Sequence, residues 1–288
     1  MDEMRAWQVN AGLAPRSEPF PLRLVKDFGL AIADKPGPVL EDVVQELVGD
    51  SGRDLDPFQP GRYQSCRTVE QSMADVLVKM ARSRPVVAVG SEVPQESLRE
   101  PPEFAGQYDP HIWFDVRLWT TALEPIAREL AELDPAHADD YRANAERVRR
   151  ELQELDRWTE ERIAEIPEAR RVLVTAHDAF GYFGRRYGLE VHGIQGISTL
   201  SEAGLQDVEQ VVDLVVSRRI PAIFVESSVP RRTVEAVVQA AAEQGHQVRV
   251  GGELFSDALG PEGTPEGTYD GMVRHNVDTI VEALRAEP

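Results

Sequence analysis

The sequence predicts an α/β protein built of two lobes, and three observations lead to this fold class. From Arg171 onward, short apolar segments typical of buried strands alternate with segments of helical periodicity. That alternation predicts a parallel sheet covered by helices. Residues 137–166 contain neither Gly nor Pro and predict one helix long enough to link two lobes. The length of 288 residues also suffices for two domains of ordinary size.

The first part of the chain has the weakest pattern. Residues 1–38 show little periodicity and scattered Pro and Gly, so we expect largely irregular structure there. Apolar residues at helical spacing predict helices at 39–48 and 68–82, and residues 85–89 are typical of a buried strand. A loop is expected at 90–110, and loops of this length are more often functional than idle.

Two helices come next. The first is expected at 115–133, where Asp115 can cap the N-terminus, and the second at 137–166. At 1.5 Å per residue the second helix would be about 45 Å long, which exceeds the width of a small domain. We therefore expect an N-terminal α/β lobe at 1–136, a linking helix at 137–166 and a C-terminal α/β lobe at 167–288.

The C-terminal lobe is expected to alternate strand and helix. The strands are predicted at 171–176, 190–194, 221–226 and 247–251, and the helices at 178–187, 201–218, 230–244 and 267–285. Parallel strands joined by right-handed crossovers follow from this order.

Three polar side chains follow strands of this lobe at the point where each strand ends. His177 and Glu226 come directly after two apolar runs, and Asp257 follows a third after a short loop. Ligands of parallel sheets bind outside the carboxyl ends of the strands. Asp257 lies between apolar residues and looks partly buried, and a buried carboxylate needs a partner such as a cation. The chemistry of these residues suggests a metal site.

His111 is a further candidate ligand, in the stretch Asp-Pro-His-Ile-Trp-Phe-Asp at residues 109–115. Pro110 stiffens the backbone beside it, so the ring could present a neutral nitrogen to a metal. The alternative is a histidine satisfied by ordinary hydrogen bonds.

The carboxylates near these residues have two interpretations each. Asp178 could orient the His177 imidazole, as carboxylates beside metal-bound histidines do, or it could cap the following helix. Glu226 could be a ligand or could hold another ligand through a hydrogen bond. Gly251 and Gly252 permit tight turning and close backbone approach.

The other acidic and histidine side chains have plainer interpretations. Glu253 is expected to be solvated, and the remaining four histidines are expected to be ordinary surface residues. These are His137, His192, His246 and His275.

Composition and missing motifs exclude several classes of function. The net charge of −19 disfavours nucleic acid as a partner. Cys66 is the only cysteine, which excludes an internal disulfide and a thiolate zinc cluster. The sequence has no His-Glu-x-x-His, phosphate-binding loop or nucleophile elbow. Residues 1–7 lack the apolar core of a signal peptide, so the chain as written would be expected in the cytoplasm.

Several stretches, taken in order, resemble the zinc/manganese solute-binding proteins of bacterial metal ABC importers, the cluster A-I family of metal-binding lipoproteins and adhesins. The resemblance runs from about Ser72 to Ala286. Its specific stretches are 109–115, 175–183, 224–228, 251–257 and 263–269. It implies two α/β lobes joined by one long helix, with the metal in the cleft between them.

The resemblance also implies roles for individual residues. His111, His177 and Asp257 would be metal ligands, and Glu226 would have a structural or hydrogen-bonding role beside them. Family members carry one more ligand, a His in an Asp-Pro-His motif of the first lobe. Here Phe58 stands where that His is expected.

The first lobe is the part that departs from the family pattern. Residues 1–71 fit it poorly, so we expect an atypical first lobe that is divergent, truncated or read in a wrong frame, and at most three recognised ligands.

By the same resemblance, the chain would capture Zn²⁺ or Mn²⁺ as a transported ligand in the periplasm or at the cell surface. It would deliver the ion to an ABC permease as a monomer, without catalysing a reaction. Three alternatives stay open: a metal-dependent hydrolase with Glu226 as general base, an adhesin or interaction protein, and a truncated relative that no longer transports.

Overall fold

The computed structural model describes residues 93–102, 108–133, 135–197, 203–261 and 263–285. The helices predicted at 39–48 and 68–82, the strand predicted at 85–89 and the position of Phe58 lie outside these residues. Most of the described part of the chain belongs to the predicted linking helix and C-terminal lobe.

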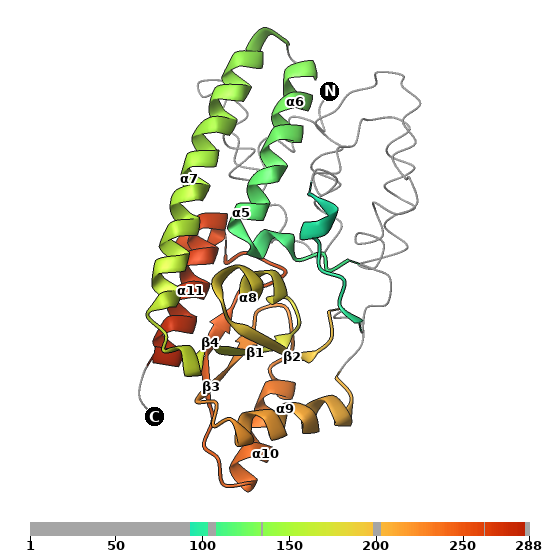
Figure 1. The fold of residues 1–288 in the computed structure, drawn as a ribbon, viewed down its shortest axis with the longest axis vertical. Helices are drawn as coiled ribbons and strands as arrows, with labels where there is room; N and C mark the ends of the chain where they lie inside the picture. The colour runs from blue at the N-terminus through green and yellow to red at the C-terminus, as the bar shows by residue number, and fades with distance from the viewer. Residues whose placement is uncertain (1–92, 103–107, 134, 198–202, 262, 286–288) are drawn as a thin grey trace.

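Four strands and several helices make up this part (Figure 1). The strands are β1 (Val172–His177), β2 (Glu190–Gln195), β3 (Ala222–Glu226) and β4 (Arg249–Leu254). The longer helices are α6 (Leu123–Leu133), α7 (Ala138–Ala164), α9 (Leu205–Ser217), α10 (Arg232–Glu243) and α11 (Tyr269–Arg285). The shorter ones are α5 (Val116–Trp119) and α8 (Gly181–Tyr187).

The strands confirm the predicted parallel pairing, as two two-stranded sheets that lie side by side. β1 pairs with β2 and β3 pairs with β4, both in parallel, and β1 lies next to β3. Every residue of β1 and β3 is buried, whereas β2 and β4 are partly exposed. Continuous apolar runs are typical of strands that are covered on both faces, which explains why β1 and β3 occupy the centre.

Alternate residues of the central strands face two different cores. Leu173 and Phe224 belong to the core formed with α6, α7, α8 and α11. Val174 and Val225 belong to the core formed with α9 and α10. Because side chains alternate across a strand, the result is three layers, with the two strand pairs between two groups of helices.

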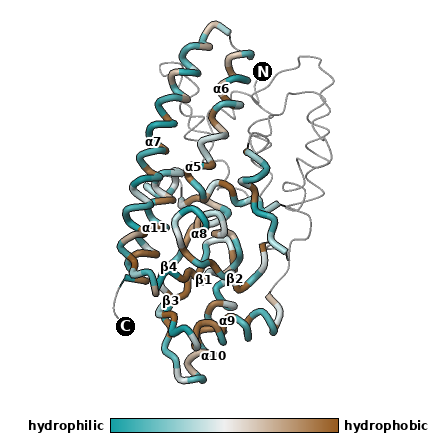
Figure 2. Tube along the Cα trace, viewed as in Figure 1, coloured by the Kyte–Doolittle hydropathy of each residue, from teal (hydrophilic) through white to brown (hydrophobic). Residues whose placement is uncertain are grey.

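The long helix is confirmed as α7, which has 27 residues and is therefore about 40 Å long. One half packs against α6 and the other against α11. Its residues are mostly hydrophilic, with hydrophobic residues recurring along the helix (Figure 2). Those positions are the buried residues of an amphipathic helix, Tyr141, Ala145, Val148, Leu152, Leu155 and Ile163. The division into lobes at 136 and 167 stays a prediction, because much of 1–136 is not described.

Two sequence predictions were wrong in detail. The helix expected at 115–133 begins as short helical turns before α6, although Asp115 does cap α5 by accepting a hydrogen bond from the Leu118 amide at 2.9 Å. Gly251 and Gly252 form no tight turn. They lie within β4, which runs three residues further than predicted and is irregular opposite Phe224.

The second property predicted for this glycine pair, close backbone approach, is present. A Cβ on Gly251 would lie 2.7 Å from the ring of Phe224 and 2.9 Å from the side chain of Ala283. Gly252 has a φ of 150° and faces Thr279. The pair therefore lets β4 pack directly against α11.

Among the described helices, none combines the length and the apolar composition needed to span a membrane.

Candidate metal centre

His177 is the last residue of β1, and a neighbouring strand end holds its imidazole. Its side chain is fully buried. Glu226, the last residue of β3, has one oxygen 2.6 Å from His177 Nδ1, and its other oxygen accepts a hydrogen bond from the His177 amide at 2.8 Å. β1 and β3 lie next to each other, and their last residues contact each other directly, without any loop between them.

His111 lies at the end of a loop, just before the short 3-10 helix Ile112–Phe114. Asp109 holds it with a single oxygen, which accepts from the His111 amide at 2.9 Å and lies 2.7 Å from His111 Nδ1. The Trp113 ring packs edge-on against the imidazole at 5.2 Å between centroids. In both histidines Nδ1 therefore faces a buried carboxylate. The opposite ring nitrogen, Nε2, is available for a different contact.

Asp257 comes three residues after β4, on a loop fixed by side chains from α11 and from the segment after β3. Asn276 accepts from the Phe255 amide at 2.9 Å and donates to the Phe255 carbonyl at 2.7 Å. The hydroxyls of Ser256 and Ser228 lie 2.8 Å apart. Asp257 keeps 19% of its side chain exposed, so the predicted partial burial is confirmed.

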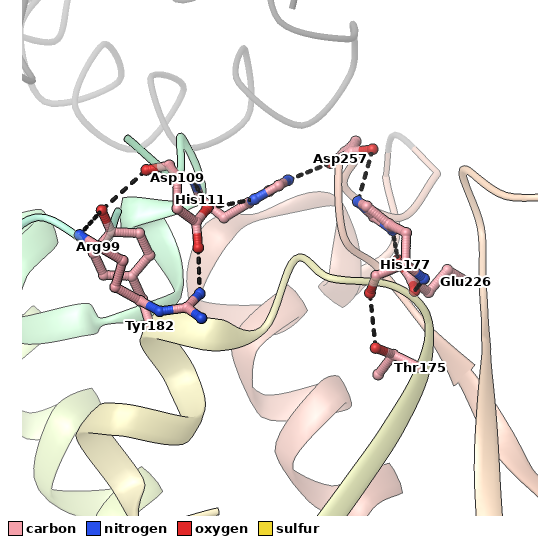
Figure 3. A network of polar contacts seen from close by, with 8 residues as sticks. All are labelled: Arg99, Asp109, His111, Thr175, His177, Tyr182, Glu226 and Asp257. Carbon is pink, nitrogen blue, oxygen red and sulfur yellow. Dashed lines mark hydrogen bonds and ion pairs between the residues drawn. The ribbon is translucent and has the colours of Figure 1, made fainter. Parts of the chain in front are cut away.

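These three side chains converge on one point (Figure 3). His111 Nε2 lies 3.4 Å from one oxygen of Asp257, and His177 Nε2 lies 3.5 Å from the other. One ligand atom from each residue lies within 4.8 Å of the other two. In the described part of the chain, neither ring nitrogen of His177 makes a hydrogen bond of good geometry, although Nδ1 lies against Glu226 and Nε2 faces Asp257. Two imidazole nitrogens and a carboxylate, spaced too widely for short hydrogen bonds, are a suitable set for a divalent cation.

Without an ion, the carboxylates dominate the electrostatics of the two imidazoles. Burial opposes the charged form of His111, but Asp109 and Asp257 outweigh it and raise its pKa to about 9. Burial likewise opposes the charged form of His177, but Glu226 and Asp257 raise its pKa to about 10. Burial disfavours the Asp257 carboxylate, yet the two histidines hold its pKa far below the usual range. The centre therefore attracts positive charge strongly.

Comparison with known proteins identifies the family of this centre. The family described as "Zinc-uptake complex component A periplasmic" matches residues 67–283. The chain belongs to this family.

Individual relatives cover most of the chain. It is 48% identical to the manganese-binding lipoprotein MntA of Bacillus subtilis over 217 residues, 75% of this chain and 71% of that protein. It is 46% identical to the zinc-binding protein TroA of Treponema pallidum over 219 residues, 75% of this chain and 70% of that protein. The solved structure of the periplasmic zinc-binding protein TroA from Treponema pallidum is similar with a TM-score of 0.73 and 45% identity, covering 76% of this chain and 78% of that one.

For this member of the zinc-uptake component A family, the predicted class of two α/β lobes is that of its solved neighbours. The relatives are named periplasmic proteins and lipoproteins. The expectation of a cytoplasmic location, which came from the start of the chain, finds no support among them.

The structure brings together His111, His177 and Asp257, and places Glu226 against His177 rather than beside the other donor atoms. Asp178 is not the N-cap of α8, because that helix begins at Gly181 with Phe180 as its N-cap. The carboxylate beside Nδ1 of His177, a role that the sequence also allowed for Asp178, belongs to Glu226.

The other histidines behave as predicted. His137 is exposed, and His192, His246 and His275 are partly exposed. His192 contacts Glu190 at 2.8 Å, and His246 and His275 contact backbone carbonyls at 2.8 and 2.9 Å. Glu253 is exposed, as predicted.

Sequence reasoning missed two residues that hold the centre in place. Asp109 precedes His111 by two residues, a spacing from which a local side-chain contact could have been proposed. Asn276 lies far along the chain on α11 and carries no motif that could have indicated its contact with Phe255.

Proposed function

We propose that this chain captures Zn²⁺ or Mn²⁺ and delivers it to the permease of an ABC importer, with His111, His177 and Asp257 as ligands. The supporting observation is the convergence of three donor atoms within 4.8 Å from segments far apart in the sequence. Two of these side chains are buried, and burying such groups together is costly unless they share a partner.

The donor set suits both ions named by the relatives. Imidazole and carboxylate ligands bind Zn²⁺ and Mn²⁺, and the usual affinity order favours Zn²⁺ over Mn²⁺. Asp257 presents one oxygen toward each imidazole, so either oxygen can contribute to coordination. MntA of Bacillus subtilis is named for manganese and TroA of Treponema pallidum for zinc. The identity of the ion therefore needs a direct measurement.

The alternative of a metal-dependent hydrolase finds no support in this geometry. A hydrolase would need a general base beside a metal-bound water, and Glu226 was the candidate. Both of its oxygens face His177, one at the ring and one at the amide. We therefore propose that Glu226 fixes the orientation and tautomer of His177, and that ion release, not chemistry, completes the functional cycle.

The experiment that tests the ligand assignment is a metal titration of the purified chain. Stripped protein would be titrated with Zn²⁺ and Mn²⁺ by calorimetry or by competition with a chelator, beside His177→Ala and the matched surface control His192→Ala. We expect one ion per chain, lost or weakened in His177→Ala and retained in the control. Absence of binding in the unsubstituted chain would contradict the proposal.

Delivery to a permease needs a separate test. A bacterial strain that lacks its own metal-binding component, but keeps the permease of a zinc or manganese ABC importer, would be supplied with the chain. Restored uptake of radioactive zinc or manganese, absent with His177→Ala, is the expected result. Action as a monomer, the adhesin role and the effect of Phe58 on transport stay predictions.

A further inference from the structure

We infer that Arg99 is a positioning residue of the metal centre, which fixes the His111 imidazole relative to His177 through Asp109 and the first turn of α8. The inference rests on the proposed function, because it concerns the same ion. Arg99 does not pair with any of the three proposed metal ligands. Its guanidinium pairs with Asp109, which holds the ligand His111. Figure 3 shows Arg99 and Tyr182 on the side of Asp109 away from Asp257.

Asp109 divides its two oxygens between two partners. One oxygen holds His111 through its amide and its Nδ1. The other oxygen is paired with the guanidinium of Arg99. Asp109 is fully buried, with 0% of its side chain exposed. A buried carboxylate that loses its cation is left uncompensated and is driven to reorient, so its hold on His111 depends on Arg99.

The start of α8 leaves space for the guanidinium. Gly181 begins α8, and a Cβ at this position would overlap the guanidinium of Arg99. Tyr182 lies beside it, with its hydroxyl accepting from the Arg99 amide and donating to the Asp109 carbonyl, each at 3.0 Å. The Arg99 guanidinium also lies 5.7 Å from the centre of the Tyr182 ring. Arg99 therefore contacts two segments, the one that carries Asp109 and the first turn of α8.

A short, packed segment connects this arginine site to the other histidine. Gly181 follows His177 closely in the sequence, and the intervening Ala179 and Phe180 are fully buried. The Phe180 ring stacks on Phe114 at 4.4 Å between centroids. Because this connection is short and packed, a side chain seated on Gly181 is fixed relative to His177. Arg99 therefore joins the segment that carries His111 to the segment that carries His177.

Two substitutions remove the same contact by different routes. Arg99→Gln removes the guanidinium, and Gly181→Ala keeps the arginine but fills its place. Alanine favours helix more than glycine does, so weaker binding in Gly181→Ala would not come from a weaker α8. Arg99→Lys keeps the charge without the planar fork of the guanidinium. Arg186→Gln is the control. Arg186 lies on α8 and pairs with Asp156 at 2.6 Å, so the substitution breaks a different arginine–aspartate pair.

The measurements are the Zn²⁺ and Mn²⁺ affinities of the five stripped proteins, their thermal unfolding, and the visible absorption of their Co²⁺ complexes. We expect Arg99→Gln and Gly181→Ala to weaken binding at least tenfold and to change the Co²⁺ spectrum, with Arg99→Lys between them and the unsubstituted chain. Arg186→Gln should lower thermal stability but stay within twofold in affinity with an unchanged spectrum.

Affinities of Arg99→Gln or Gly181→Ala within twofold of the control would overturn the inference, as would a loss in only one of the two. A loss that follows unfolding temperature across all variants, the control included, would also overturn it. Failure of the unsubstituted chain to bind any ion would instead contradict the proposed function. If Arg99→Gln does not fold, Gly181→Ala and Arg99→Lys decide the matter.

Discussion

Substitution of Glu226 by Gln offers the sharpest test of how the centre is held. Glu226 is 1% exposed and uses both oxygens on His177, one 2.6 Å from Nδ1 and one 2.8 Å from the amide nitrogen. An amide has only one oxygen, so the glutamine side chain could accept from one of these groups while its NH₂ faced the other. The change is nearly isosteric, and the expected effect comes from the lost acceptor and the lost charge.

The magnitude follows from this geometry. Loss of a hydrogen-bonding partner behind a metal-bound histidine typically lowers metal affinity 10–100-fold, which corresponds to about 1.4–2.7 kcal/mol. We expect Glu226→Gln to fall in this range, because one glutamine oxygen cannot serve both Nδ1 and the amide of His177, so the ring and its tautomer are held less firmly. The affinity would be measured by competition of the stripped protein with a fluorescent chelator for Zn²⁺.

The matched control is Glu253→Gln, an exposed acid on β4 opposite Val225 of β3. It removes the same charge from a nearby strand and should leave affinity within twofold. An affinity of Glu226→Gln that matches this control would show that the carboxylate behind His177 does not contribute to binding. The reasoning would then be refuted even if the ion is bound.

Three further predictions concern the ion directly. His177→Ala and Asp257→Ala should each weaken binding at least tenfold, about 1.4 kcal/mol or more, because each removes a metal ligand. Unchanged affinity by calorimetry in either variant would contradict the ligand set. The metal-free pKa values of about 9 at His111 and about 10 at His177 predict that metal binding releases protons and strengthens as pH rises from 6 towards 9. Calorimetry in buffers of different ionisation enthalpy would detect the released protons. Equal affinity at pH 6 and pH 8 would contradict this prediction. Free ion at 100 times its dissociation constant should add about 2.7 kcal/mol to the free energy of unfolding, which thermal unfolding with and without chelator would detect.

The C-terminal lobe could be predicted from the sequence because its strands carry an unambiguous signal. The continuous apolar runs that became β1 and β3 could only be buried on both faces, and their carboxyl ends then had to meet. This is why His177 and Glu226 were correctly placed together. The end of a predicted strand can be located to within a residue or two. That accuracy is enough to predict which side chains lie at the carboxyl ends of the strands.

The details that could not be predicted depend on contacts between distant segments. The glycines at 251 and 252 permit both a turn and a close approach, and only the packing of Phe224 and Ala283 decides between them. Asp178 and Glu226 were both reasonable orienting partners for His177. The packing of β3 beside β1, which the local sequence does not specify, places Glu226 against the ring.

The two imidazoles are held in the same way by unrelated parts of the chain, and this explains why an ion fits between them. Asp109 and Glu226, each buried, contact Nδ1 of His111 and His177. A carboxylate at Nδ1 favours the tautomer whose Nε2 carries a lone pair, so both histidines direct an unprotonated Nε2 toward Asp257 once an ion replaces the protons. A divalent cation can accept two such lone pairs and a carboxylate at once.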